Sequence, residues 1–140
     1  MTGLEAMNAI VAGDAPAPPI AELVGFDLAE VGEGRASFAL DPGERHYNPL
    51  GTVHGGIAAT LLDSAMGCAV HTTLGADERY TTLELKVNFV RAITEATGRV
   101  VASGSVIHRG GRVATAEARL TDEDGRLLAH ATSTCLIMAA

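Results

Sequence analysis

The amino-acid sequence predicts a single α+β domain in which an antiparallel sheet curves around one long helix. Three observations favour this class: a long helical pattern in mid-chain, four strand-like segments after it, and one strand-like segment before it. At 140 residues the chain has a common single-domain length, and a hydrophobic content of 47% is sufficient for one core. A helix that is apolar around most of its circumference must be covered by other elements, and only a curled sheet is available here.

The N-terminal segment differs in composition from the rest of the chain. Residues 1–12 are compatible with a short helix, whereas residues 13–19 contain three of the five prolines, which exclude regular structure. We therefore expect residues 1–19 to be a leader or linker and residues 20–140 to form one domain.

The elements up to the long helix follow from periodicity and turn chemistry. Residues 20–25 suggest a helical turn, and residues 34–40 alternate weakly enough to be a first strand. Residues 41–52 are rich in Pro, Gly, Asn and Asp, so we expect an ordered loop. From residue 56 to residue 74 apolar residues recur at three- and four-residue spacing, and Gly75 is placed as a stop signal.

The remaining sequence predicts strands. Leu83, Leu85, Val87 and Phe89 alternate with polar residues. Three further strand-like segments follow, at residues 98–108, 113–121 and 127–138, and the turns at 109–112 and 122–125 are short enough for antiparallel hairpins. A single curled sheet of five to six strands leaves its edges unpaired, so we expect the fold to associate with itself.

Composition excludes several classes of partner. Ten basic and seventeen acidic residues give a net charge of −7, which disfavours nucleic acid. Cys68 and Cys135 form no CxxC motif and are too few for a disulfide framework, and we expect two buried thiols. The first fifteen residues lack a basic segment, and no apolar run approaches the ~20 residues of a membrane span, so we expect a cytoplasmic protein.

The segment NPLGTVHGGIAATLLD, from Asn48 to Asp63, places polar residues where packing alone does not need them. His54-Gly55-Gly56 opens the long helix, where unpaired backbone N–H groups and the helix dipole can stabilise an oxyanion. Asp63 lies two turns further along, among apolar neighbours, where a carboxylate is costly to bury without a partner. Each feature also has a structural reading, a tight turn or a solvent-facing Asp. Their joint occurrence suggests acyl transfer to water.

Asn48, Gly51, His54-Gly55-Gly56 and Leu62-Asp63 resemble the PaaI-type (phenylacetic acid degradation) branch of the hotdog-fold acyl-CoA thioesterases, and the similarity runs from about Pro19 to Met138. The resemblance implies a hotdog fold, homodimers whose active sites are shared between subunits, and a dimer of dimers. It also implies an acyl-CoA substrate with an aryl-acetyl or medium-length acyl group, and no cofactor besides the CoA of the substrate.

Carried over to this sequence, the resemblance implies roles for individual residues. The Gly55 N–H would be the oxyanion donor, and Asp63 the nucleophile or general base. Asn48 would orient water or the carboxylate, and His54 would support the loop and the thioester. A hydroxyl often assists the acid, and we favour Thr82 over Thr81 because Thr82 falls on the strand face opposite the leucines.

The CoA phosphates require local positive charge. The resemblance places this site at the turn formed by His108, Arg109, Gly110, Gly111 and Arg112, with Gly56 and Arg91 as additional candidates, although a solvated hairpin tip explains the turn nearly as well. The other histidines, His46, His71 and His130, have no ligand-like spacing, and we expect no metal site.

Two alternatives remain at this stage. A hydratase or dehydratase shares the architecture but relies on a His paired with an acid, and the approach to His54 lacks the Pro- and Phe-rich sequence of the acyl-carrier-protein dehydratases. A non-catalytic acyl-CoA-binding protein keeps the fold without the chemistry.

Overall fold

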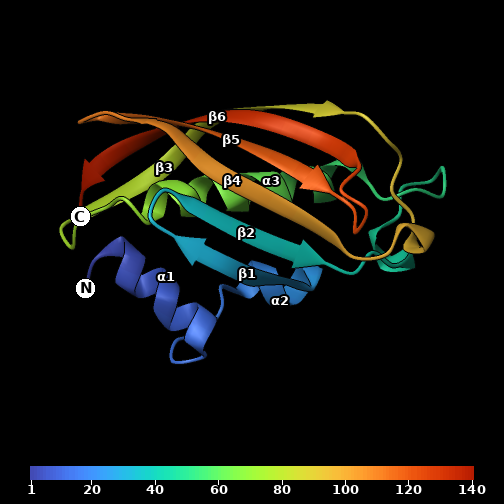
Figure 1. The fold of residues 1–140 in the computed structure, drawn as a ribbon, viewed down its shortest axis with the longest axis horizontal. Coiled ribbons are helices and arrows are strands. Elements are labelled where there is room, and N and C mark those ends of the chain that lie inside the picture. Colours follow the sequence, from blue (N-terminus) through green and yellow to red (C-terminus); the bar gives the residue numbers. More distant parts are fainter.

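A long central helix, α3 (Gly55–His71), lies in the concave face of a six-stranded antiparallel sheet (Figure 1). The computed structural model describes all of residues 1–140. The strands are ordered β1 (Phe26–Gly32), β2 (Arg35–Leu40), β4 (Val100–Arg109), β5 (Val113–Thr121), β6 (Leu127–Ala139) and β3 (Glu78–Phe89). The predicted class, an antiparallel sheet around one long helix, is therefore confirmed.

The core lies between α3 and the inner face of the sheet. Leu61, Leu62 and Met66 of the helix are fully buried, and Leu120 and Cys135 contribute from the strands. Small side chains dominate the inner faces of β4 and β5, so the helix backbone approaches the sheet closely.

Strand β1 was not predicted from the sequence, where the first strand was expected at residues 34–40. Only Phe26 of β1 is buried, because β1 is an edge strand that pairs with β2 alone. An edge strand of this kind lacks the apolar alternation on which a sequence-based assignment depends. The other edge is β3, which pairs with β6 alone.

Helix α3 ends at His71, before the expected stop at Gly75. The Thr72 and Thr73 hydroxyls donate to the carbonyl oxygens of Ala69 and Val70, both at 2.6 Å. Hydroxyls near a helix end compete with the backbone in this way and favour termination.

Strand β3 begins at Glu78, five residues earlier than expected, and it contains a bulge at Leu83. The bulge changes which side chains point inward, so Leu83 is 57% exposed while Thr82 faces the same side as Leu85. The prediction that Thr82 lies on the strand face opposite the leucines was therefore wrong, because simple alternation does not continue through a bulge.

The N-terminal residues lie beyond the β1 edge of the sheet and contact both β1 and α3 (Figure 1). Thr2 caps α1 (Gly3–Ala12) through a capping box with Glu5, and Gly3 donates its N–H to the Leu74 carbonyl. Met7 is buried against the body of the protein. The segment that follows leads into the short helix α2 (Pro19–Val24). Two single turns of 3-10 helix, η1 (Glu44–His46) and η2 (Glu95–Thr97), complete the fold.

Candidate active site

The loop before α3 is held together by the side chain of Asn48. Its Oδ1 accepts hydrogen bonds from the backbone N–H groups of Leu50 (2.9 Å) and Thr52 (3.2 Å), and its Nδ2 donates to Thr52 Oγ1 (3.0 Å). Gly51 adopts a φ of 83°, which permits the sharp return of the chain. In this structure Asn48 fixes the loop that precedes the helix start; its predicted contact with water or with the Asp63 carboxylate stays a prediction.

The first turn of α3 presents one free N–H group. His54 is the N-cap residue, and its Nδ1 accepts the Gly56 N–H at 2.8 Å. The Ile57 N–H donates to the His54 carbonyl oxygen at 2.9 Å. The Gly55 N–H has no acceptor within the chain. Gly55 therefore carries the available donor at the positive end of the helix dipole, as an oxyanion site requires.

The His54 ring is exposed, and its hydrogen bond defines its chemistry. Because Nδ1 is the acceptor for an N–H group, a neutral ring carries its proton on Nε2. His54 can therefore donate from Nε2 to a bound group.

A cavity of about 270 Å³ lies beside the helix start. The ring of Phe89, at the end of β3, lies over Gly55, so closely that a Cβ at residue 55 would be 3.0 Å from the ring. Arg91 lines the same cavity, and its exposed side chain forms no ion pair. The structure thus places one predicted phosphate-binding residue, Arg91, next to the predicted oxyanion donor.

Asp63 is half-buried on α3 and receives a hydrogen bond from strand β3. Thr82 Oγ1 donates to Asp63 Oδ1 at 3.1 Å, and Cys135 Sγ lies 3.9 Å from the same hydroxyl. Burial raises the pKa of the Cys135 thiol, so this neighbour is a neutral group near the carboxylate. The structure brings the two predicted residues, Asp63 and Thr82, into direct contact.

Gly55 and Asp63 do not meet within one chain. They are eight residues apart on the same helix, which separates their backbone positions by about 12 Å at 1.5 Å per residue. A thioester carbonyl cannot contact both at once. A reaction centre that uses both groups needs a second copy of the chain.

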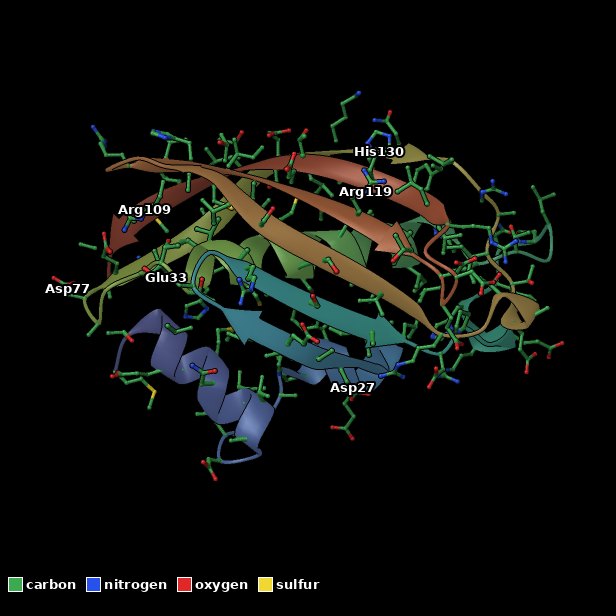
Figure 2. The ribbon with its side chains drawn as sticks, in the orientation of Figure 1. Asp27, Glu33, Asp77, Arg109, Arg119 and His130 are labelled. Carbon is green, nitrogen blue, oxygen red and sulfur yellow. The ribbon has the colours of Figure 1, made fainter.

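The turn at residues 109–112 lies at the end of the molecule where β3 begins, away from the loops around Gly55 (Figure 2). The Arg109 side chain is held in place, because it donates to Glu78 Oε1 at 2.8 Å and to the Gly110 carbonyl oxygen, and only 27% of it is exposed. The Gly75 N–H and then Arg109 lower the pKa of Glu78. Arg112, in contrast, is exposed and forms no ion pair.

This turn lies at the Asp63 end of the molecule rather than at the Gly55 end. Arg109 is the β-sheet partner of Ala114, Ala114 of Cys135, and Cys135 of Thr82. This row across the sheet links the turn to β3, whose Thr82 hydroxyl donates to the Asp63 carboxylate. The predicted CoA residues thus fall into two groups, Gly56 and Arg91 at the helix start, and the 108–112 turn at the Asp63 end. His108 is exposed in this turn, and Gly111 has open space around it.

The remaining histidines have local roles or none. His46 is buried, with Nδ1 accepting the Gly43 N–H at 3.1 Å and Nε2 2.8 Å from the Val24 carbonyl oxygen. His71 packs against Tyr80. His130 lies on the outer face of the sheet near Arg119 (Figure 2).

Three residues around Gly55 and Asp63 were not predicted from the sequence as part of the site. Phe89 covers Gly55, Cys135 contacts Thr82, and Tyr80 packs its hydroxyl end against Gly67, one helical turn beyond Asp63. Tyr80 precedes Thr82 by two residues on the same strand face, and this spacing was the signal that could have identified it.

Comparisons with known proteins identify the family of the chain. A model of the thioesterase superfamily matches residues 50–129. The chain is 28% identical over 138 residues to the 1,4-dihydroxy-2-naphthoyl-CoA hydrolase of Escherichia coli, covering 96% of this chain and 94% of that protein. It is 32% identical over 98 residues to the medium/long-chain acyl-CoA thioesterase YigI of Salmonella typhimurium, covering 61% and 62% of the two chains.

Solved structures show the same fold. A phenylacetic acid degradation-related protein of Ralstonia eutropha superposes with a TM-score of 0.83 at 28% identity, covering 93% of this chain and 98% of that one. The family model matches more than half of the length of this chain, so the chain belongs to the thioesterase superfamily. It is a thioester hydrolase, with the fold expected from the hotdog resemblance. None of its helices is both long and apolar enough to cross a membrane.

Proposed function

We propose that this protein is a PaaI-type acyl-CoA thioesterase that hydrolyses aryl-acetyl-CoA or medium-chain acyl-CoA to the free acid and CoA. The observation that carries the proposal is the presence on one helix of a free Gly55 N–H at the helix start and of a carboxylate, Asp63, that accepts a hydrogen bond from Thr82. An acyl-transfer site needs these two elements, an oxyanion donor and a base or nucleophile. Names of the relatives mention naphthoyl-CoA and medium- to long-chain acyl-CoA, which supports a CoA thioester as substrate.

In the proposed reaction the thioester carbonyl oxygen accepts the Gly55 N–H of one subunit while Asp63 of the other subunit acts at the carbonyl carbon. The carboxylate either attacks the carbon and forms an anhydride that water hydrolyses, or takes a proton from a water that attacks. Either route breaks the carbon–sulfur bond and releases CoA as the thiolate. Thr82 holds Asp63 in position by donating a hydrogen bond from its hydroxyl group.

The proposed sites are shared across a homodimer. The separation of about 12 Å between Gly55 and Asp63 along α3 supports this arrangement. Edge strand β3, with its exposed backbone edge and exposed Leu83 and Phe89, provides a surface that a second copy can cover. A dimer of dimers remains part of the proposal through the PaaI resemblance.

The turn around Arg112 is the proposed contact for the CoA phosphates at the Asp63 end, and Arg91 at the Gly55 end. Arg112 and Arg91 are both exposed and unpaired, so their charges are available to a phosphate. Arg109 forms an ion pair with Glu78, which supports a role in holding the conformation of the turn.

The test is release of free thiol from a panel of aryl and aliphatic acyl-CoA esters by the wild-type protein and by Asp63→Asn. The amide keeps the shape of the side chain and removes its charge, so we expect the fold to persist and turnover to fall by orders of magnitude. Full activity in Asp63→Asn would refute the proposed mechanism. Binding of CoA esters without turnover by the wild type would identify a non-catalytic acyl-CoA-binding protein.

A further inference from the structure

A second cavity, of about 350 Å³, lies under the N-terminal segment. Met7 and Ile10 of α1 and Ala17 of the following linker form one wall, and Leu28 of β1 and Phe38 of β2 form another. The volume falls within the range of small-molecule sites, roughly 300–1,000 Å³. The segment expected to be a leader thus encloses an apolar space against the body of the fold.

The remaining wall comes from Cys68 and His71 of α3 and from Tyr80 of β3. Burial raises the pKa of the Cys68 thiol to about 12, with a further contribution from the charge of Asp63. Burial also lowers the pKa of His71 and raises that of Tyr80. All three groups are therefore uncharged near neutral pH, and no other lining residue is ionisable. The cavity suits an uncharged, apolar occupant.

The cavity borders the Asp63 site through Tyr80. Tyr80 lines the cavity, and its hydroxyl end packs against Gly67, one helical turn beyond Asp63. The charge of Asp63 contributes to the raised pKa of two lining groups, Cys68 and Tyr80, so the carboxylate lies near this wall. Cys68 is five residues beyond Asp63, about 7.5 Å further along the helix axis and on a different face of α3.

We propose that this cavity binds the distal methylene groups of a linear, medium-length acyl chain whose thioester lies at Asp63. The inference rests on the acyl-CoA thioesterase function proposed above and names its substrate class. An acyl chain whose thioester lies at Asp63 must extend at least about 7.5 Å to reach Cys68, a span that a butyryl group is too short to cover and a decanoyl group exceeds. The ring of a phenylacetyl group, one methylene from the carbonyl, stays beside Asp63.

Other parts of an acyl-CoA molecule fit the cavity less well. The pantetheine arm carries amide groups that need hydrogen-bond partners, and the nucleotide carries phosphates that need positive charge. The lining includes no Lys or Arg, and eight of its eleven residues are hydrophobic. A hydrocarbon chain requires neither kind of partner.

The test is the dependence of kcat/KM on acyl length, from butyryl-CoA to dodecanoyl-CoA, in the wild type and in Ala17→Phe. Each methylene that enters the cavity should raise the wild-type value about fourfold, the equivalent of about 0.8 kcal/mol per buried CH₂. Ala17→Phe fills the cavity from an exposed position and should lower the value for decanoyl-CoA at least tenfold. Activity on butyryl-CoA should stay within about twofold, because that chain does not reach the cavity.

Ala12→Phe is the matched control, because Ala12 is an exposed residue of the same N-terminal segment that does not line the cavity. It should behave as the wild type at every chain length. Ile10→Phe fills the cavity from α1 and repeats the test if Ala17→Phe does not fold. A flat length dependence, or Phe variants that match the wild type on decanoyl-CoA, would overturn the inference and leave the thioesterase function intact.

If the wild type hydrolyses none of the esters, the proposed function fails. Calorimetric measurement of acyl-CoA binding then tests separately whether the cavity takes the acyl chain. Decanoyl-CoA should then bind at least tenfold more tightly than butyryl-CoA, and Ala17→Phe should abolish that difference. Equal affinities in the wild type would overturn the cavity assignment as well.

Discussion

Replacement of Gly55 by proline removes the proposed oxyanion donor with little change elsewhere. Position 55 is the first residue of α3, where proline is well tolerated because its φ matches the helix and its N–H has no intrahelical acceptor. His54, the preceding residue, has φ −56° and ψ 134°, the extended conformation that a following proline requires. The fold should therefore accept Gly55→Pro.

The expected loss of activity follows from the hydrogen bonds of the first helical turn. The Gly56 and Ile57 N–H groups are already engaged by His54, so they cannot replace the missing donor without breaking those bonds. Removal of one oxyanion donor typically costs about 2.7–4 kcal/mol of transition-state stabilisation, or roughly 10²- to 10³-fold in kcat. Steady-state thiol release from the best ester of the panel measures this loss.

Gly55→Ala is the control for the new side chain. Both variants place a Cβ about 3.0 Å from the exposed Phe89 ring, but only alanine keeps the N–H. We expect Gly55→Ala to retain most of its kcat after a small movement of that ring. Equal kcat in the proline and alanine variants, with both folded, would refute the assignment of the oxyanion donor.

Variants at three further positions test other contacts. Thr82→Val should lower kcat by roughly ten- to a hundredfold, the value of a hydrogen bond to a charged group, while Thr82→Ser should largely restore it; equal rates would remove Thr82 from the mechanism. Arg112→Ala should raise KM for CoA esters by roughly five- to tenfold at constant kcat, and an unchanged KM would place the phosphates elsewhere. Gly104→Ala should lower the free energy of unfolding by about 1–3 kcal/mol in urea titrations, because a Cβ there would overlap the Ala65 carbonyl of α3; wild-type stability would contradict this close approach.

The sequence predicted the parts of the fold that depend on regular periodicity. Strand β5 has the predicted bounds, and α3 and β6 differ from theirs by a few residues, because their buried positions follow helical or alternating spacing. Strand β1 escaped prediction because an edge strand with one buried residue carries no such pattern. The bulge at Leu83 escaped as well, because it depends on pairing with β6 rather than on local sequence.

The candidate site was predictable where it lies in one contiguous motif. The loop from Asn48, the helix start at Gly55 and the carboxylate of Asp63 are all within sixteen residues, so their spacing along the chain is informative. The ion pair of Arg109 with Glu78 joins residues on two distant strands, and nothing in the local sequence of the turn indicates it. Pairings of this kind are defined by the sheet order.

The cavity under the N-terminal segment illustrates the same limit. Its walls come from α1, the linker, α2, three strands and α3, and the prolines of residues 13–19 gave no indication that this segment encloses a space. Helical spacing placed Asp63 on α3 but could not show which side of the helix the chain leaves partly open.

The central claim is that Gly55 of one subunit and Asp63 of another act on the same thioester. The most direct test mixes Asp63→Asn and Gly55→Pro subunits after unfolding and refolding them together. A hybrid dimer contains one site with both native residues and one site with neither, so random pairing should restore about one quarter of wild-type activity from two nearly inactive parents. Activity that stays at the level of the parents, although hybrid dimers form, would contradict a site shared between subunits.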